Sequence, residues 1–138
     1  YVLQSKNHDL ISLKKELEFI DSFIFLHKVR IGDALEYSVN ISDEIVQMQI
    51  PPLTLQILIE NAIKHNIANE ENVLKISIES GSYNTLIVSN NLQIIDTVDS
   101  TYTGLSNLSK RFELLKKDGF TYGEKEDNFV VTIPLIEE

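Results

Sequence analysis

Hydrophobic and polar residues alternate along this chain with two different periods. Apolar residues recur at three- and four-residue steps over about 13–30, which predicts an amphipathic helix. Ser12 precedes this segment as a candidate N-cap, and Gly32 follows it as a candidate C-cap. Strict alternation over 35–41 predicts a strand, and 45–50 is a shorter candidate strand.

Two consecutive prolines, Pro51 and Pro52, separate these elements from a second helical segment. Proline cannot continue a strand interior but is tolerated at a helix start, so a helix is expected over about 53–66. The elements expected after it are, in order, strand 73–79, turn 81–84, strand 85–89, polar loop 90–103, helix 105–117, and strands 120–125 and 128–135.

This order of elements predicts one domain of the α+β class. Hairpins imply a mixed, mostly antiparallel sheet, and about three helices on one face of it make a two-layer α/β sandwich. A chain of 138 residues is long enough for one sizeable core. The chain begins within a pattern and without methionine, so we expect residues 1–12 to be the end of a preceding helix or linker and residues 13–138 to be the domain.

Composition narrows the functional classes. The net charge of -9 disfavours a general nucleic-acid binder, because attraction to phosphates requires a basic surface. The absence of cysteine excludes thiol catalysis and disulfides, and the three histidines have no zinc-ligand spacing. No apolar run approaches the roughly 20 residues that span a bilayer, so we expect no direct membrane contact. Average glycine usage would give about ten residues; the chain has only five, which leaves few for a glycine-rich phosphate loop.

One predicted helix, 53–66, carries an unusual polar stripe made of Glu60, Asn61, Lys64 and His65. One interpretation is a solvated helix face. The other is a ligand site, because asparagine and histidine are mediocre helix formers. An asparagine oxygen suits Mg²⁺, and a neighbouring lysine suits phosphate.

Four segments follow one another in a characteristic order, namely LKKELEFIDSFIFLHKVRIGD, IPPLTLQILIENAIKHN, TGLSNLSKRFELL and FVVTIPL. Together they span nearly the whole chain, from residue 13 to residue 135, and resemble the catalytic domain of LytS-type sensor histidine kinases in the GHKL superfamily. The resemblance implies the Bergerat ATP-binding fold, ATP and Mg²⁺ as cofactors, and protein-histidine kinase activity. With this resemblance, residues 1–12 are expected to be the end of a preceding dimerisation helix or a linker.

The resemblance assigns roles to the stripe on helix 53–66. ENAIKHN resembles the family's N box, in which Asn61 would coordinate Mg²⁺ through its side-chain oxygen. Lys64 and His65 would lie near the phosphates or the ribose, and Glu60 would lie next to the metal ligand.

Two further boxes are matched in part. Asn90, followed by Asn91, aligns with the aspartate that accepts the adenine amino group, and Leu92 stands at a usual glycine position. A turn after a strand is the alternative interpretation of the two asparagines.

The segment from Thr103 to Asn107 resembles the second half of the lid box, in which Gly104, Leu105 and Asn107 match and Tyr102 replaces a glycine. Gly104 would allow close approach of phosphate to a helix start. Arg111 matches a later position on the same helix. Because the chain is acidic, Lys64, His65 and Arg111 are the candidates for a basic cluster that binds Mg-ATP.

The resemblance also bears on the reaction. ATP-hydrolysing members carry a glutamate general base four residues before the metal ligand, and this chain has Ile57 there. We therefore expect no efficient ATP hydrolysis by this domain alone. A kinase can work without this base, since phosphoryl transfer rests mainly on positioning and charge neutralisation. No catalytic residue is expected in this chain, because the acceptor histidine is absent from it. The acceptor histidine is expected elsewhere. His8 fits a frayed leading helix, and His27 lies on the apolar stripe of the first helix, so a packed histidine with a partner is expected there.

Three hypotheses follow. The first is a histidine kinase catalytic domain that phosphorylates a histidine of its own homodimer; its partners would be the dimerisation and phospho-acceptor domain and a response regulator. This domain would be the cytoplasmic part of a protein anchored in the inner membrane. The second is a degenerate relative with weak or no ATP binding that serves as an interaction module, which Asn90, Leu92 and Tyr102 motivate. The third, a GHKL ATPase, is disfavoured by Ile57.

Overall fold

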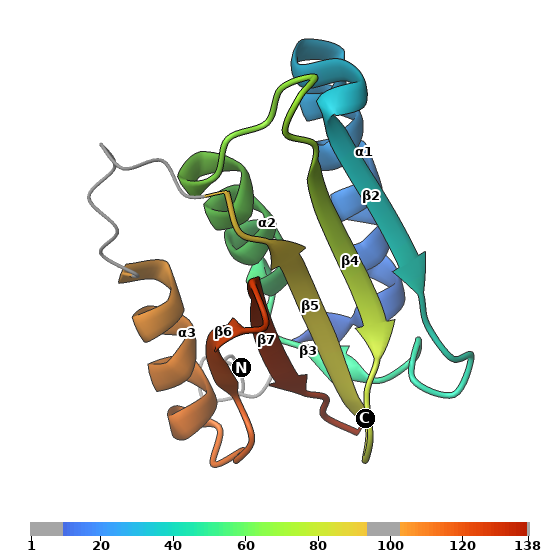
Figure 1. The fold of residues 1–138 in the computed structure, drawn as a ribbon. Coiled ribbons are helices and arrows are strands. Elements are labelled where there is room, and N and C mark those ends of the chain that lie inside the picture. Colours follow the sequence, from blue (N-terminus) through green and yellow to red (C-terminus); the bar gives the residue numbers. More distant parts are fainter. Residues whose placement is uncertain (1–9, 94–102, 138) are drawn as a thin grey trace.

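A five-stranded sheet carries three α-helices on one face within residues 10–93 and 103–137, which the computed structural model describes (Figure 1). The strand order is β2-β4-β5-β7-β6. β2 and β4 are parallel, and the other neighbouring strands are antiparallel. The predicted two-layer α+β sandwich with a mixed, mostly antiparallel sheet is therefore confirmed.

The helices are α1 (Leu13–Ile31), a short 3-10 helix η2 (Gly32–Ala34), α2 (Thr54–His65) and α3 (Thr103–Leu114). The strands are β1 (Ile11–Ser12), β2 (Leu35–Asn40), β3 (Gln49–Ile50), β4 (Leu74–Ser80), β5 (Thr85–Asn91), β6 (Thr121–Lys125) and β7 (Asn128–Pro134). Expectations that fall on 1–9 or 94–102, including those for His8 and Tyr102, lie outside the described residues. The proposed division at residue 12 stays a prediction.

The first helix begins and ends where its local signals indicate. The Ser12 side chain accepts a hydrogen bond from the Lys15 N–H at 3.2 Å, as an N-cap does. Gly32 ends the helix with a φ of 74°, which favours glycine. The candidate strand 45–50 is mostly wrong, because only Gln49 and Ile50 form a strand, which pairs with the unpredicted β1.

Alternation along the strands separates a buried sheet face from an open one. On β4, Leu74, Ile76 and Ile78 are buried against the helix layer, whereas Lys75 and Glu79 are exposed on the opposite face. β5 has the same alternation and continues through Asn91, so the polar loop begins later than residue 90. The core lies between this face and the helices, and its buried members include Leu13, Ile20, Leu55, Ile59, Leu105, Phe112 and Ile133.

The other two helices differ from prediction at their ends. α2 begins at Thr54, after Leu53 has taken a left-handed conformation with a φ of 70°. α3 begins at Thr103 and ends at Leu114, earlier than the predicted 117. Lys116 has a φ of 56°, which is incompatible with a continuing helix.

Candidate functional site

The second half of α2 presents the predicted polar residues to one side. Glu60 and Lys64 are exposed, Asn61 and His65 are half-buried, and Ala62 between them is buried against the core. These positions follow from the 3.6-residue period, which turns every third and fourth residue to the same side. Asn61 thus lies on an accessible flank of a helix whose other side is fixed by packing.

Gly104 brings α3 close to α2 beside Asn61. A Cβ atom added to Gly104 would lie 3.0 Å from Ile57 Cγ2 and 3.5 Å from Asn61 Nδ2. Glycine therefore permits an approach that a larger residue would oppose. The N-box residue Asn61 and the lid-box residue Gly104 are neighbours in space. Ile57, which stands at the general-base position of the ATPases, is a packing residue against the first turn of α3.

The other end of α3 lies at the other end of α2. Arg111 Nη1 donates a hydrogen bond to the Pro52 carbonyl at 2.9 Å. α3 therefore runs antiparallel to α2, from the level of Asn61 toward Pro52. Gly104 and Arg111 are seven residues apart, which is about 10 Å along a helix axis. The structure thus does not group Arg111 with Lys64 and His65 as the sequence suggested.

Two other lid-box matches on α3 have different environments. Leu105 is 1% exposed and belongs to the hydrophobic core. Asn107 is exposed, one turn after Gly104. The match at Leu105 is therefore explained by packing, whereas Asn107 is accessible to a ligand on the flank that faces α2.

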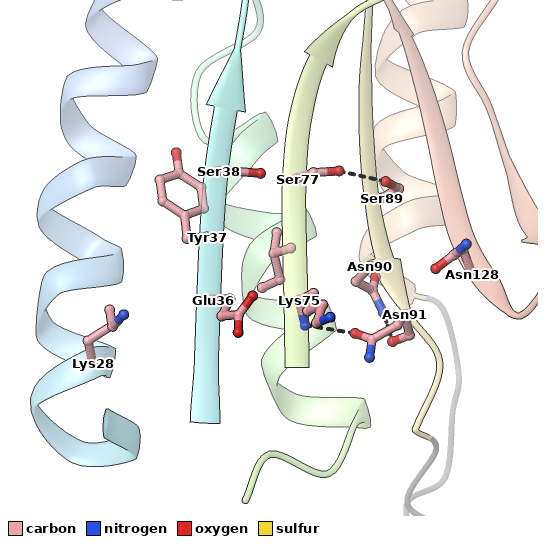
Figure 2. A pocket seen from close by; sticks show the side chains of 11 residues that line it. Lys28, Glu36, Tyr37, Ser38, Lys75, Ser77, Ser89, Asn90, Asn91 and Asn128 are labelled. Carbon is pink, nitrogen blue, oxygen red and sulfur yellow. Dashed lines mark hydrogen bonds between the residues drawn. The ribbon is translucent and has the colours of Figure 1, made fainter. Parts of the chain in front are cut away.

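Asn90 and Asn91 point to opposite faces of the sheet, because consecutive strand residues do. Asn90 alternates with the buried Val88 and is itself 7% exposed, on the helix side; its Nδ2 donates to the Asn91 carbonyl at 2.8 Å. Asn91 lies on the other side, where its Oδ1 accepts from the Lys75 N–H at 2.7 Å (Figure 2). Its Nδ2 donates to the Val73 carbonyl at 3.0 Å. Asn91 thus joins β5 to the start of β4, and only Asn90 faces the layer that holds Asn61.

A polar connection between α2 and β5 was not anticipated from the sequence. Asn66, which follows α2, is 6% exposed; its Oδ1 accepts from the Gln93 N–H at 2.7 Å, and its Nδ2 donates to the Ala62 carbonyl at 2.9 Å. Gln93 also donates through Nε2 to the Ile67 carbonyl at 2.7 Å. These bonds hold the end of β5, and with it Asn90, beside the end of α2. The buried asparagine was within the quoted motif, but sequence alone gave no sign of its partner.

A hollow between α1 and the end of α2 adjoins the polar stripe. His27 and Arg30 of α1 line it together with Glu60 and Lys64 of α2. The His27 ring forms an edge contact with Phe23 and has its Nδ1 3.1 Å from an Arg30 nitrogen, so the expectation of a packed and partnered histidine is confirmed. Burial and the Arg30 charge hold the pKa of His27 below its usual value, although Glu60 opposes them.

His65 also has an environment that disfavours its charged form. Burial and the neighbouring Lys64 hold the pKa of His65 below its usual value. Its Nδ1 is buried without a hydrogen-bond partner among the described residues. A neutral imidazole here can donate or accept a hydrogen bond without adding a second full charge to Lys64.

Curated relatives of this chain are LytS sensor proteins. The LytS proteins of Bacillus subtilis and Staphylococcus saprophyticus are 32% and 38% identical to it, over 55% and 50% of this chain. The sensor histidine kinase/phosphatase LytS of Staphylococcus aureus is 32% identical over 66% of it. These alignments cover 13%, 12% and 16% of the relatives, so the chain spans a small part of their length. No protein-family model matches the chain.

Solved structures establish the fold. The catalytic domain of histidine kinase ThkA superposes with a TM-score of 0.61 at 18% identity, over 94% of this chain and 97% of that one. The Acinetobacter baumannii histidine kinase AdeS gives a TM-score of 0.61 at 18% identity, over 93% of this chain and 66% of that one. This chain is thus similar in sequence to LytS-type sensor kinases and has the fold of histidine kinase catalytic domains. Among residues 10–93 and 103–137, no helix is both long and apolar enough to cross a membrane.

Proposed function

We propose that this domain binds Mg-ATP between α2 and α3 and presents the γ-phosphate to a histidine outside this chain. The observation that carries the proposal is the contact region of Asn61 and Gly104, which come from two separate motifs. An asparagine oxygen and a glycine at a helix start together offer a metal ligand and backbone N–H groups for phosphate.

The residues around this region fit Mg²⁺ carried by a nucleotide. Mg²⁺ is usually held by one or two protein oxygens together with substrate phosphates, so it needs no complete protein cage. The described residues contain no group of three or more His, Cys, Asp or Glu that could hold a metal by itself. Asn61 would supply the protein oxygen, and Mg²⁺, when bound, would neutralise charge on the β- and γ-phosphates.

The remaining residues have separate tasks in this proposal. Lys64, one turn after Asn61, offers a point charge for phosphate oxygens, and His65 offers a neutral hydrogen-bonding group beside it. Asn90 faces the helix layer at the end of β5 and offers an amide oxygen to the adenine amino group. Ile57 has no proton-accepting atom, so an attacking water would not be activated from this position.

Mg²⁺-dependent stabilisation by a non-hydrolysable ATP analogue tests the proposal. Ligand at 100 times its Kd stabilises the folded state by about 2.7 kcal/mol, which raises the melting temperature. We expect this rise for the wild-type chain with Mg²⁺ and its loss in Asn61→Ala. The matched control Asn40→Ala, an exposed asparagine at the end of β2, should behave like wild type. If saturating analogue and Mg²⁺ leave the wild-type melting temperature unchanged, the domain is instead an interaction module without nucleotide binding.

A second measurement distinguishes a kinase domain from an ATPase. The wild-type chain with Mg-ATP should release phosphate no faster than Asn61→Ala in a steady-state assay, because Ile57 replaces the general base. Robust turnover that depends on Asn61 would contradict this expectation and favour the ATPase hypothesis.

We further propose the setting in which the domain acts. Because its relatives are much longer sensor proteins, the acceptor histidine would belong to a dimerisation domain of the same homodimeric protein, with this domain on the cytoplasmic side of the membrane. ThkA, whose fold this chain shares, has been solved in complex with the response regulator TrrA. A response regulator is therefore the proposed receiver of the phosphoryl group.

A further inference from the structure

The carboxylate of Glu16 is buried although it lies in the first turn of α1. Glu16 is 2% exposed, while its neighbours Lys15 and Glu18 on the same helix are exposed. Its Oε2 accepts the Leu55 N–H at 2.9 Å, and its Oε1 accepts the Leu53 N–H at 3.3 Å. A buried carboxylate is costly unless such partners satisfy it. The geometry therefore points to a specific task for Glu16.

That task is to cap α2 from another helix. The first N–H groups of a helix have no partner within it and are usually satisfied by the N-cap side chain. At the N-cap position of α2 stands Leu53, which makes no side-chain capping bond. Glu16 supplies the missing acceptor, and its negative charge lies at the positive end of the α2 dipole.

Arg111 joins α3 to the same point. It donates to the carbonyl of Pro52, directly before the capped turn of α2. Burial raises the pKa of Glu16, while the bonds from Leu55 and Leu53 and the charge of Arg111 act in the opposite direction. Three helices thus meet at the first turn of α2.

Further backbone bonds fix the chain leading into this turn. The Leu13 N–H donates to the Met48 carbonyl at 2.8 Å. Leu13 directly follows β1 and Met48 directly precedes β3, so this bond lies next to the paired residues Ser12 and Gln49. Ile136 also exchanges backbone bonds with Gln49, at 2.7 and 2.9 Å. Backbone bonds from several segments therefore fix the chain before α2. The side chain of Glu16 adds hydrogen bonds to the first turn of the helix itself.

The position of this anchor matters for Asn61. Asn61 lies seven residues beyond Thr54, or about 10 Å along the axis, so a tilt of about 5° at the first turn would move it by about 1 Å. A misplacement of about 1 Å at a reacting site can reduce a rate by a factor of about 100. The close packing of Gly104 against α2 leaves little room to absorb such a tilt.

We propose that Glu16 and Arg111 are positioning residues, which hold the first turn of α2 against α1 and α3 and thereby set Asn61 opposite Gly104. This inference rests on the proposed function, because it assumes that the positioned residue, Asn61, binds the nucleotide through Mg²⁺. Neither residue touches the nucleotide in this proposal. Arg111, which the sequence suggested as a phosphate contact, acts here through Pro52 and Glu16.

The first test measures the geometry without nucleotide. Because the chain has no cysteine, nitroxide labels on Glu60→Cys in α2 and Lys110→Cys in α3 are unique, and pulsed electron-spin resonance gives their distance distribution. We expect Glu16→Gln to shift or broaden this distribution, because the substitution keeps the size but removes one carboxylate oxygen. Glu18→Gln, an exposed change of equal charge on the same helix, should leave it unchanged.

The second test measures affinity for the Mg²⁺-bound ATP analogue at a temperature at which every variant is folded. We expect Glu16→Gln to weaken binding by about tenfold or more. We expect a smaller loss for Arg111→Ala, because Arg111 is exposed. Ile78→Val, a buried core variant on β4, serves as the control for stability loss alone.

The outcomes separate the two proposals. An unchanged distance distribution in Glu16→Gln overturns the positioning role, whatever the affinity. An affinity loss in Ile78→Val as large as that in Glu16→Gln, at equal loss of stability, also overturns it. If the wild-type chain binds no analogue, the proposed function fails, and the distance measurement still decides whether Glu16 positions α2.

Discussion

The two ends of α2 are built in opposite ways. At its start, backbone groups are satisfied by Glu16 of α1, and Pro52 is bonded to Arg111 of α3. Near its end, Asn61 and Lys64 are accessible, and one packed contact to Gly104 brings α3 close. The comparison teaches that one helix can be fixed at one end in order to present its side chains at the other. Each end should therefore respond differently to substitution.

The largest effect should come from removing the anchor at the start of α2. Glu16→Ala leaves the buried Leu55 N–H and the partly buried Leu53 N–H without their acceptor, so we expect a loss of about 2–3 kcal/mol in the free energy of unfolding. Asn61→Ala, at the other end, should change that free energy by no more than about 0.5 kcal/mol, because the site is half-exposed. Urea denaturation of both variants measures the difference. Equal destabilisation by the two would contradict the contrast between the ends.

A smaller effect should come from the one packed contact at the end of α2. In Gly104→Ala the new methyl group meets Ile57 Cγ2 at 3.0 Å. Overpacking costs about 1–3 kcal/mol, whereas alanine gains about 1 kcal/mol in helix propensity over glycine, so we expect a net loss of about 0–2 kcal/mol in the free energy of unfolding. Binding of the Mg²⁺-bound analogue should weaken as α2 and α3 are pushed apart.

A double-mutant cycle with Ile57→Ala isolates this contact. Removing Cγ2 from Ile57 should relieve the strain of Gly104→Ala, which would give a coupling energy of about 0.5–1 kcal/mol. Gly123→Ala on β6 is the matched control, because an added Cβ there meets no atom within 4 Å. Additive effects in the cycle would show that the two side chains do not constrain each other.

The elements that could be predicted from the sequence are those whose signals are local. Ser12 and Gly32 bound α1 as expected, because both caps act on residues within a few positions. The hairpin of β4 and β5 was equally predictable, because apolar and polar residues alternate in both strands and a turn signal at 81–84 separates them. The β1–β3 pair was not, because a two-residue strand is too short to show a period.

The candidate site was predictable only in part, for the same reason. Asn61 and Gly104 stand in recognisable motifs, whereas the roles of Glu16 and Asn91 depend on partners in other elements. In the sequence, Glu16 resembles an ordinary acidic residue in the first turn of a helix. Its carboxylate oxygens nevertheless accept hydrogen bonds from backbone N–H groups 37 and 39 residues away. Asn91 resembles a turn residue but bonds to β4. Such long-range pairing is decided by the packed fold and leaves no local pattern.

The smallest expected effect is a pH response of opposite sign at the two ends of α2. Burial raises the pKa of Glu16, so the folded state holds that proton more tightly than the unfolded state does. The contribution of Glu16 to stability is then largest below its usual pKa of about 4.5 and declines as pH rises through the raised value. Burial and Lys64 lower the pKa of His65, so its contribution is present above about 6.5 and is lost as pH falls toward the lowered value.

Unfolding free energies of wild type, Glu16→Gln and His65→Gln between pH 4 and pH 8 measure these two contributions, because the other acidic groups are common to all three chains. Relative to Glu16→Gln, the wild-type chain should lose stability as pH rises above about 4.5; relative to His65→Gln, it should lose stability as pH falls below about 6.5. Slopes of the same sign in both comparisons would mean that at least one of the two groups is not in the environment described. Opposite slopes would show that different titrating groups act at the anchored start and at the accessible end of α2. A pH dependence of nucleotide binding could then be assigned to one end of the helix.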